Sequence, residues 1–129
     1  MIYGIGTDLV KIDRIAKMCK TYGANAVAEK MLSRIEALEW PSANQPVQFL
    51  AKRFAAKEAF AKAVHTGLRS PSRFETLASV TMSWAVRNFI VEKTLSTMAQ
   101  PKKTSAVSIS ALTDEENYIV AFVVAEYLK

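Results

Sequence analysis

The sequence predicts a small α+β protein in which a mostly antiparallel sheet packs on one long helix and several short ones. A strand-like segment opens the chain, helical patterns fill residues 13–65, and most of the remainder alternates like strands. Elements in the order strand, helices, strands are typical of the α+β class. Half of the 129 residues are hydrophobic, and we find no repeat or linker, so we expect a single domain over residues 1–129.

The first strand is predicted over residues 2–10, which read IYGIGTDLV. Its apolar character indicates a buried strand, and its glycines mark sites where another backbone approaches closely. Helical spacing follows over residues 13–22, and residues 24–32 continue as a second short helix.

The longest helix is predicted over residues 47–65, because alanine and straight-chain residues dominate there and glycine and proline are absent. Before it, Ser33 and Glu36 form a capping box that predicts a third short helix ending ahead of Pro41. After it, Thr66-Gly67 supplies a natural helix stop.

The remaining third of the chain is predicted to be mostly strands. These strands are expected at residues 74–83, 86–91, 105–111 and 118–127. A short helix is predicted at 92–100 and an acidic turn at 113–117. The last strand is so apolar that we expect it to be buried on both faces or against another subunit.

Net charge and composition narrow the function. A charge of +5 favours acidic partners, which include nucleic acid, phosphorylated small molecules and acidic proteins. We find no zinc-ligand spacing, RNA-binding aromatic motif or arginine-rich tail, so nucleic acid binding is not expected. The single cysteine, Cys19, is consistent with a reducing cytoplasm. No apolar run approaches the ~18 residues of a membrane span, and the N-terminus lacks signal-peptide features, so we expect a cytoplasmic location.

The long helix carries the first chemically informative residue. Steps of four residues place Leu50, Phe54, Glu58 and Lys62 in one row. Glu58 would lie at the edge of the core, where a carboxylate needs a cation, a hydrogen-bond donor or a metal. Periodicity alone favours the simpler interpretation, a helical Glu58–Lys62 pair of small energetic value.

Asp8 is the second such residue, since aspartate is unfavourable in an apolar strand. Taken alone, it would be interpreted as a cap for the following helix. Together, Asp8 and Glu58 are also what Mg²⁺ needs, because Mg²⁺ is held by one or two carboxylates with substrate phosphates. Nearby lysine and arginine would then serve the phosphates. Sequence spacing does not choose between these interpretations.

Two segments resemble the signatures of bacterial holo-acyl-carrier-protein synthases. Residues 4–10 (GIGTDLV), followed by Ile12 and Arg14-Ile15, resemble the N-terminal signature. Residues 49–63 (FLAKRFAAKEAFAKA) resemble the second and most specific one. The closing segments 107–110 and 121–126 are similar to the family's C-terminal strands.

The resemblance implies Mg²⁺-dependent transfer of 4′-phosphopantetheine from coenzyme A to a serine of apo-acyl carrier protein, giving holo-acyl carrier protein and 3′,5′-ADP for fatty-acid biosynthesis. Asp8 and Glu58 match the metal-binding carboxylates, and Glu58 and Lys62 are the expected catalytic residues. Glu58 or a metal-bound water would accept the serine proton. The family forms homotrimers with active sites between subunits.

Further site residues follow from the same resemblance. Coenzyme A is expected to contact Arg53, Phe54, Lys62, Gly67 and Ser110. Acyl carrier protein is expected to dock on the first helix through Arg14, Lys17, Met18 and Lys20.

The sequence departs from the family pattern in three places. Ala111 stands where histidine is usual, His65 where glycine is usual, and residues 82–88 lack the usual Asn-Asp pair and Gly-Lys-Pro turn. The alternatives are a relative that binds coenzyme A or carrier protein without transfer, and a basic scaffold or nucleic-acid-binding module motivated only by charge.

Overall fold

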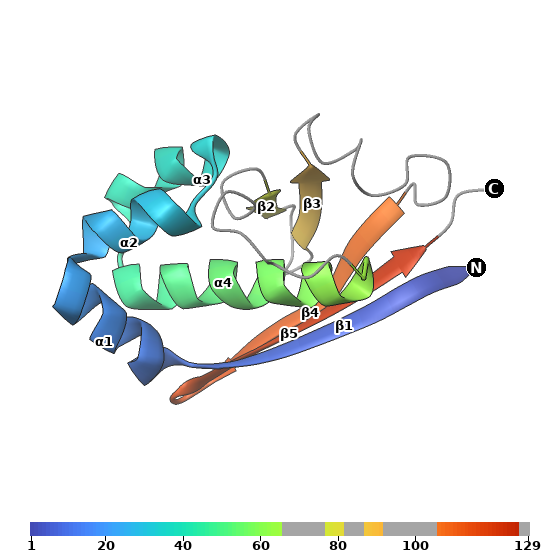
Figure 1. Cartoon of the computed structure of the whole chain (residues 1–129), viewed down its shortest axis with the longest axis horizontal. Helices are drawn as coiled ribbons and strands as arrows, with labels where there is room; N and C mark the ends of the chain where they lie inside the picture. The colour runs from blue at the N-terminus through green and yellow to red at the C-terminus, as the bar shows by residue number, and fades with distance from the viewer. Residues whose placement is uncertain (66–76, 82–86, 92–105, 127–129) are drawn as a thin grey trace.

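A five-stranded antiparallel sheet and a long helix lying across it form the framework of the protein (Figure 1). The computed structural model describes residues 1–65, 77–81, 87–91 and 106–126, with side chains for residues 1–65 and 115–126. The strands, in spatial order, are β1 (Ile2–Lys11), β5 (Tyr118–Glu126), β4 (Ala106–Glu115), β3 (Arg87–Val91) and β2 (Leu77–Thr81). The α+β class predicted from the sequence is confirmed.

The helices lie between β1 and β2 in the chain. They are α1 (Ile12–Tyr22), α2 (Ala24–Met31), α3 (Arg34–Glu39), the 3₁₀ helix η1 (Trp40–Ser42) and α4 (Pro46–Ala63). Figure 1 shows α1, α2 and α3 gathered around the N-terminal end of α4. Among the described residues, none of these helices has the length and apolar character required to cross a membrane.

Several element boundaries differ from the sequence prediction. Helix α4 ends at Ala63 rather than His65, because His65 adopts a left-handed conformation with φ 59°. The predicted stop at Thr66-Gly67 and the predicted helix at 92–100 lie outside the described residues. The acidic turn is shorter than predicted, since β4 continues to Glu115 and Glu116 (φ 44°) makes the turn.

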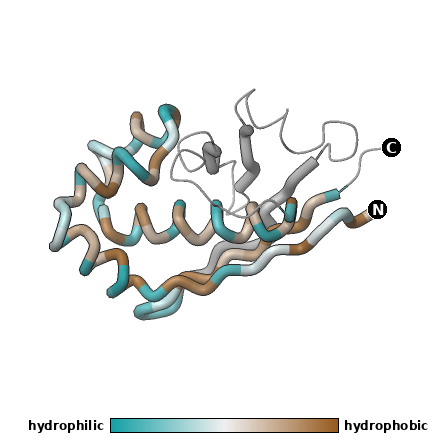
Figure 2. Tube along the Cα trace, viewed as in Figure 1, coloured by the Kyte–Doolittle hydropathy of each residue, from teal (hydrophilic) through white to brown (hydrophobic). Residues whose placement is uncertain are grey.

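Strands β1 and β5 are each buried on one face only. Ile119, Ala121 and Val123 are fully buried, whereas Ile5 and Leu9 are 52% and 64% exposed. The two strands run side by side and are hydrophobic over much of their length (Figure 2). Within the chain the last strand is therefore not buried on both faces, and the alternative, burial against another subunit, stays a prediction. We call the exposed side of this strand pair the outer sheet face, which includes Ile5, Leu9, Tyr118 and Val120.

The inner face of β1 touches the backbone of α4 directly. A Cβ atom on Gly6 would lie 1.8 Å from the carbonyl oxygen of Ala59, and one on Gly4 would lie 2.0 Å from that of Ala63. Only glycine permits this contact, as the sequence predicted. Because side chains alternate along a strand, Asp8 points to the same side as these glycines, toward α4.

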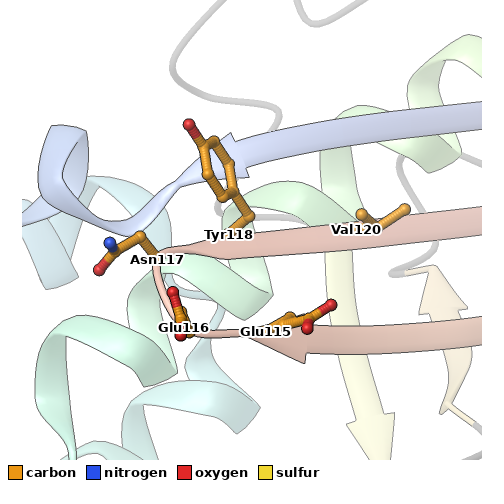
Figure 3. A pocket seen from close by; sticks show the side chains of 5 residues that line it. All are labelled: Glu115, Glu116, Asn117, Tyr118 and Val120. Atoms are coloured by element: carbon orange, nitrogen blue, oxygen red, sulfur yellow. The ribbon is translucent and has the colours of Figure 1, made fainter.

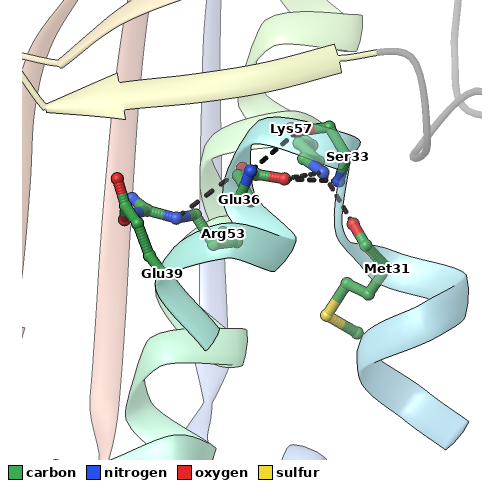
Figure 4. A network of polar contacts seen from close by, with 6 residues as sticks. All are labelled: Met31, Ser33, Glu36, Glu39, Arg53 and Lys57. Atoms are coloured by element: carbon green, nitrogen blue, oxygen red, sulfur yellow. Dashed lines mark hydrogen bonds and ion pairs between the residues drawn. The ribbon is translucent and has the colours of Figure 1, made fainter. Parts of the chain in front are cut away.

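A buried ionic network fixes α2 and α3 to α4 (Figure 4). The predicted capping box is confirmed, with Ser33 N–H donating to Glu36 Oε2 (2.8 Å) and Glu36 N–H donating to Ser33 Oγ (3.3 Å). Lys57 is 0% exposed and donates to Glu36 Oε2 and to the carbonyl oxygen of Met31, each at 2.6 Å. Burial lowers the pKa of Lys57, and the Glu36 carboxylate opposes that shift. The network satisfies charges that would be costly to bury alone.

Candidate active site

Asp8 and Lys62 meet between β1 and α4. Lys62 Nζ lies 3.0 Å from Asp8 Oδ1 and also donates to the carbonyl oxygen of Thr7 at 2.9 Å. The side chain of Asp8 is 14% exposed and that of Lys62 is 53% exposed. The close approach of α4 to Gly4 and Gly6 makes this contact possible, since it brings the helix within reach of the Asp8 carboxylate.

Glu58 lies on the same face of α4, one turn before Lys62. The row runs from the core to solvent, with Leu50 buried, Phe54 and Glu58 half-buried and Lys62 exposed. Burial raises the pKa of the Glu58 carboxyl, and the negative charge of Asp8 raises it further. Lys62 and Arg14 act in the opposite direction. Glu58 is therefore electrostatically coupled to charged groups from β1, α1 and its own helix.

Arg14 brings α1 to the same place. Its guanidinium carbon lies 5.5 Å from the centre of the Phe54 ring, a cation–π arrangement. Its charge also acts on Glu58. Arg14, predicted as a carrier-protein contact, thus borders the group of Asp8, Glu58 and Lys62, which we call the carboxylate–lysine site.

The donor set of this site fits a small hard cation. Two carboxylates, on β1 and α4, lie close enough for the negative charge of Asp8 to raise the pKa of Glu58. Mg²⁺ prefers such oxygen ligands and would offset their repulsion. Mg²⁺ sites in proteins commonly combine one or two carboxylates with waters and substrate phosphates. Among the described residues there is no group of three or more histidine, cysteine or acidic side chains arranged to hold a metal.

Comparison with known proteins identifies the family. Residues 4–123 match the 4′-phosphopantetheinyl transferase superfamily, a span that includes every residue of the carboxylate–lysine site. The chain belongs to this superfamily. It is 46% identical over 126 residues to the holo-[acyl-carrier-protein] synthase of Neisseria meningitidis serogroup A, with 98% of this chain and 99% of that protein covered.

Solved structures of phosphopantetheinyl transferases share the fold. The crystal structure of the Neisseria meningitidis holo-[acyl-carrier-protein] synthase matches with a TM-score of 0.88 at 46% identity, covering 98% of this chain and 99% of that one. The Bacillus anthracis synthase, solved in complex with CoA (3′,5′-ADP), matches with a TM-score of 0.77 at 28% identity, covering 99% of each chain.

Not every predicted site residue of this phosphopantetheinyl transferase joins the carboxylate–lysine site. Arg53 is only 3% exposed, lies 4.6 Å from the Phe49 ring centre and pairs with Glu39 at 2.7 Å. Its guanidinium group is directed toward Glu39 on α3 (Figure 4). Gly67 lies outside the described residues, and the side chain of Ser110 in β4 is not described.

The predicted docking residues of this transferase lie along α1. Lys17 and Lys20 are exposed and Met18 is half-buried, while Ile15 packs in the core. The basic face of α1 therefore continues from the edge of the carboxylate–lysine site into solvent.

A separate pocket lies at the β4–β5 turn of the transferase (Figure 3). It is lined by Glu115, Glu116, Asn117, Tyr118 and Val120. None of these belongs to the predicted site, and two acidic side chains do not suit a diphosphate. The pocket adjoins α1, because Ile12 N–H donates to the carbonyl oxygen of Asn117 at 2.8 Å.

Two features of the site were missed by the sequence analysis. The Thr7 carbonyl group binds Lys62, but a backbone acceptor leaves no signal in a side-chain pattern. The electrostatic effect of Arg14 on Glu58 depends on how α1 packs against α4, which sequence spacing does not reveal.

Proposed function

We propose that this chain is a Mg²⁺-dependent holo-acyl-carrier-protein synthase. It transfers 4′-phosphopantetheine from coenzyme A to a serine hydroxyl of apo-acyl carrier protein and releases 3′,5′-ADP. The observation that carries the proposal is the meeting of Asp8 and Lys62, 54 residues apart in the chain, beside Glu58. The relatives named above, one of them solved with CoA (3′,5′-ADP), support the same reaction.

Asp8 and Glu58 are the residues that would hold the metal. When bound, Mg²⁺ supplies neutralisation of the coenzyme A diphosphate and orientation for in-line attack. Glu58, or a water held beside it, would accept the proton of the serine hydroxyl.

Lys62 and Arg14 supply positive charge for the phosphates. The ammonium group of Lys62 is 53% exposed on a flexible side chain, so it can stabilise charge that develops on the departing 3′,5′-ADP. Arg14 borders the same site and also starts the basic face of α1. The attacking hydroxyl belongs to the carrier protein, so the chain needs no nucleophile of its own.

Acyl carrier protein would dock on the basic face of α1. Arg14, Lys17 and Lys20 are exposed on this helix, and Met18 offers a half-buried apolar contact beside them. Opposite charges on the two partners would accelerate their encounter and set its orientation. Docking there would deliver the serine to the carboxylate–lysine site, since Arg14 lies at the border of that site and also starts the basic face of α1.

We also propose a homotrimer with active sites between subunits. The outer sheet face is apolar and exposed, with Leu9 at 64%, Ile5 at 52% and Tyr118 at 45% exposure. Such a face is suited to burial against another copy. In the trimer, Arg53, Phe54, Gly67 and Ser110 remain proposed coenzyme contacts. The enzyme would work in the cytoplasm, in fatty-acid biosynthesis.

Intact mass spectrometry tests the reaction. Apo-acyl carrier protein is incubated with the chain, coenzyme A and Mg²⁺, beside a sample with EDTA. We expect a metal-dependent mass gain of one phosphopantetheine group. No gain with several carrier proteins and a folded sample would favour a relative that binds coenzyme A or carrier protein without transfer.

A further inference from the structure

The ammonium group of Lys62, which the proposed function assigns to the substrate phosphates, contacts two oxygen atoms of β1 instead. It lies 3.0 Å from Asp8 Oδ1 and donates to the Thr7 carbonyl oxygen at 2.9 Å. Both contacts hold it against β1. The proposed function requires the same Asp8 carboxylate to hold a divalent cation.

We propose that Lys62 and the divalent cation compete for Asp8, so that metal binding displaces the ammonium group from β1 and releases it for the substrate phosphates. This inference rests on the proposed function, because it takes Asp8 as a metal ligand. The inference also sets an order of binding, in which the ammonium group of Lys62 leaves Asp8 when the metal binds and contacts the diphosphate afterwards.

The arrangement of charges supports competition. An ammonium group in contact with Asp8 repels a second cation at the same carboxylate, and the repulsion doubles for a divalent ion. Asp8 is only 14% exposed, so few directions of approach remain open to a cation. Two carboxylates, Asp8 and Glu58, face two cationic side chains, Lys62 and Arg14, in this region. A metal ion that binds Asp8 therefore adds positive charge to a group of side chains whose charges already balance, which weakens its binding unless Lys62 moves away.

The exposure of the Lys62 side chain makes its displacement from Asp8 feasible. Its side chain is 53% exposed, whereas Lys57, in a different row of α4, is 0% exposed and held in the ionic network. Because the Lys62 end of the pair is open to solvent, which screens its attraction to Asp8, a metal ion can replace the ammonium group without disturbing the packing of α4 on β1.

Metal titration of the whole chain tests the competition without any turnover. Mn²⁺ is titrated calorimetrically into the wild type, Lys62→Met and the matched control Lys30→Met, without coenzyme A. Lys30 is an exposed lysine near the end of α2, so its replacement changes the net charge equally. We expect Lys62→Met to bind Mn²⁺ on the order of tenfold more tightly than the wild type, and Lys30→Met to match the wild type.

A double variant assigns the effect to Asp8. In an Asp8→Asn background, Lys62→Met should no longer tighten Mn²⁺ binding, because the shared carboxylate is gone. Equal affinity in the wild type and Lys62→Met would overturn the competition while leaving the metal site intact. Absence of binding in every variant would overturn both the inference and the proposed metal ligands.

A measurement on the wild type avoids any dependence on variant folding. Mass spectrometry can follow the labelling of each lysine by an amine-reactive reagent as Mg²⁺ is added. We expect labelling of Lys62 to rise with Mg²⁺ and labelling of Lys30 to stay constant. Constant or falling labelling of Lys62 would contradict displacement.

Discussion

At the scale of single residues, Glu58 shows the conflict between stability and chemistry most clearly. Its half-buried carboxylate lies beside the negative charge of Asp8, and both conditions raise its pKa. A proton acceptor benefits from this shift. The same shift lowers the stability of the folded state at neutral pH, because burial and a neighbouring negative charge disfavour the ionised carboxylate.

Glu58→Gln should therefore stabilise the fold at neutral pH and abolish transfer. The pKa of Glu58 is raised above its ordinary value of 4.5 in the folded state. The folded chain thus retains this proton to higher pH than the unfolded chain, and the free energy of unfolding falls as pH rises through that window. We expect a gain below about 1 kcal/mol at pH 7, since solvent screens a half-exposed group.

Urea unfolding in EDTA measures this gain. The difference between the wild type and Glu58→Gln should vanish at a pH well below 4.5, where both side chains are neutral. Glu29→Gln, an exposed position on α2, serves as the control. Lower stability of Glu58→Gln at pH 7 would contradict the expected strain at this carboxylate.

Site residues could be predicted from the sequence where a charged side chain occurred in an apolar pattern. Asp8 in an apolar strand and Glu58 at the edge of an apolar stripe both stood out, and the structure brings both into one site. Lys57 was not recognised, because a lysine in an alanine-rich helix is usually exposed. Its burial depends on Glu36 reaching it from α3, a contact between distant segments.

At the scale of elements, the geometry of the site is set by the contact of β1 with α4. The glycines of β1 allow the helix backbone to lie directly on the strand, and Lys62 then reaches Asp8. An added methyl group at Gly6 would meet the carbonyl oxygen of Ala59, which is backbone and cannot rotate away.

Gly6→Ala should separate α4 from β1 and weaken both stability and transfer. Overpacking typically costs about 1–3 kcal/mol, and a backbone neighbour places this case at or above ~3 kcal/mol. Urea denaturation and the transfer assay measure the two effects. Ala26→Ser, which adds one atom at an exposed site of α2, should change neither. Wild-type stability of Gly6→Ala would show that the two elements are less tightly joined than described.

The ionic network predicts a different pattern for Lys57. Lys57→Met removes the closest described cation from the buried carboxylate of Glu36, whereas Arg53 Nε lies farther away, at 3.6 Å from Glu36 Oε1. Breaking one partner of a buried pair costs about 3–5 kcal/mol. Lys57→Met combined with Glu36→Gln should recover most of this loss, because the amide oxygen introduced at position 36 can still accept from Ser33 N–H and the buried carboxylate is gone. Thermal and urea unfolding of the three chains compare these costs, and equal stability of the single and double variants would refute the coupling.

The order and type of the described elements were predictable from periodicity and capping, but strand burial was not. Ile5 and Leu9 are apolar although they point away from α4, so β1 has hydrophobic residues on both faces. Such a strand has the sequence of a fully buried one. The end of α4 was also misplaced, because the left-handed conformation of His65 has no signal in helix propensity.

At the scale of the whole molecule, the outer sheet face is a row of exposed apolar side chains on two paired strands. Leu9 pairs with Val120 across β1 and β5, and Ile5 and Tyr118 extend the same exposed apolar side. The proposed trimer would bury this side and join each active site to a neighbouring subunit.

Leu9→Lys should therefore disrupt assembly and reduce transfer. A charge on the outer sheet face would have to be buried without a partner in the trimer. Analytical ultracentrifugation should show the wild type as a trimer and the variant shifted toward monomers. Leu38→Lys is the matched control, since Leu38 is 81% exposed on α3, away from this face. A trimeric Leu9→Lys would remove the outer sheet face from the interface.

The pairing of Lys57 with Glu36 also constrains how this sequence can diverge. A lineage that loses either charge passes through an intermediate that carries the other one buried and uncompensated. Selection would remove most such intermediates, because ordinary stability leaves only ~5–15 kcal/mol in reserve. Positions 36 and 57 are therefore expected to change in concert among descendants of this chain, although 21 residues separate them.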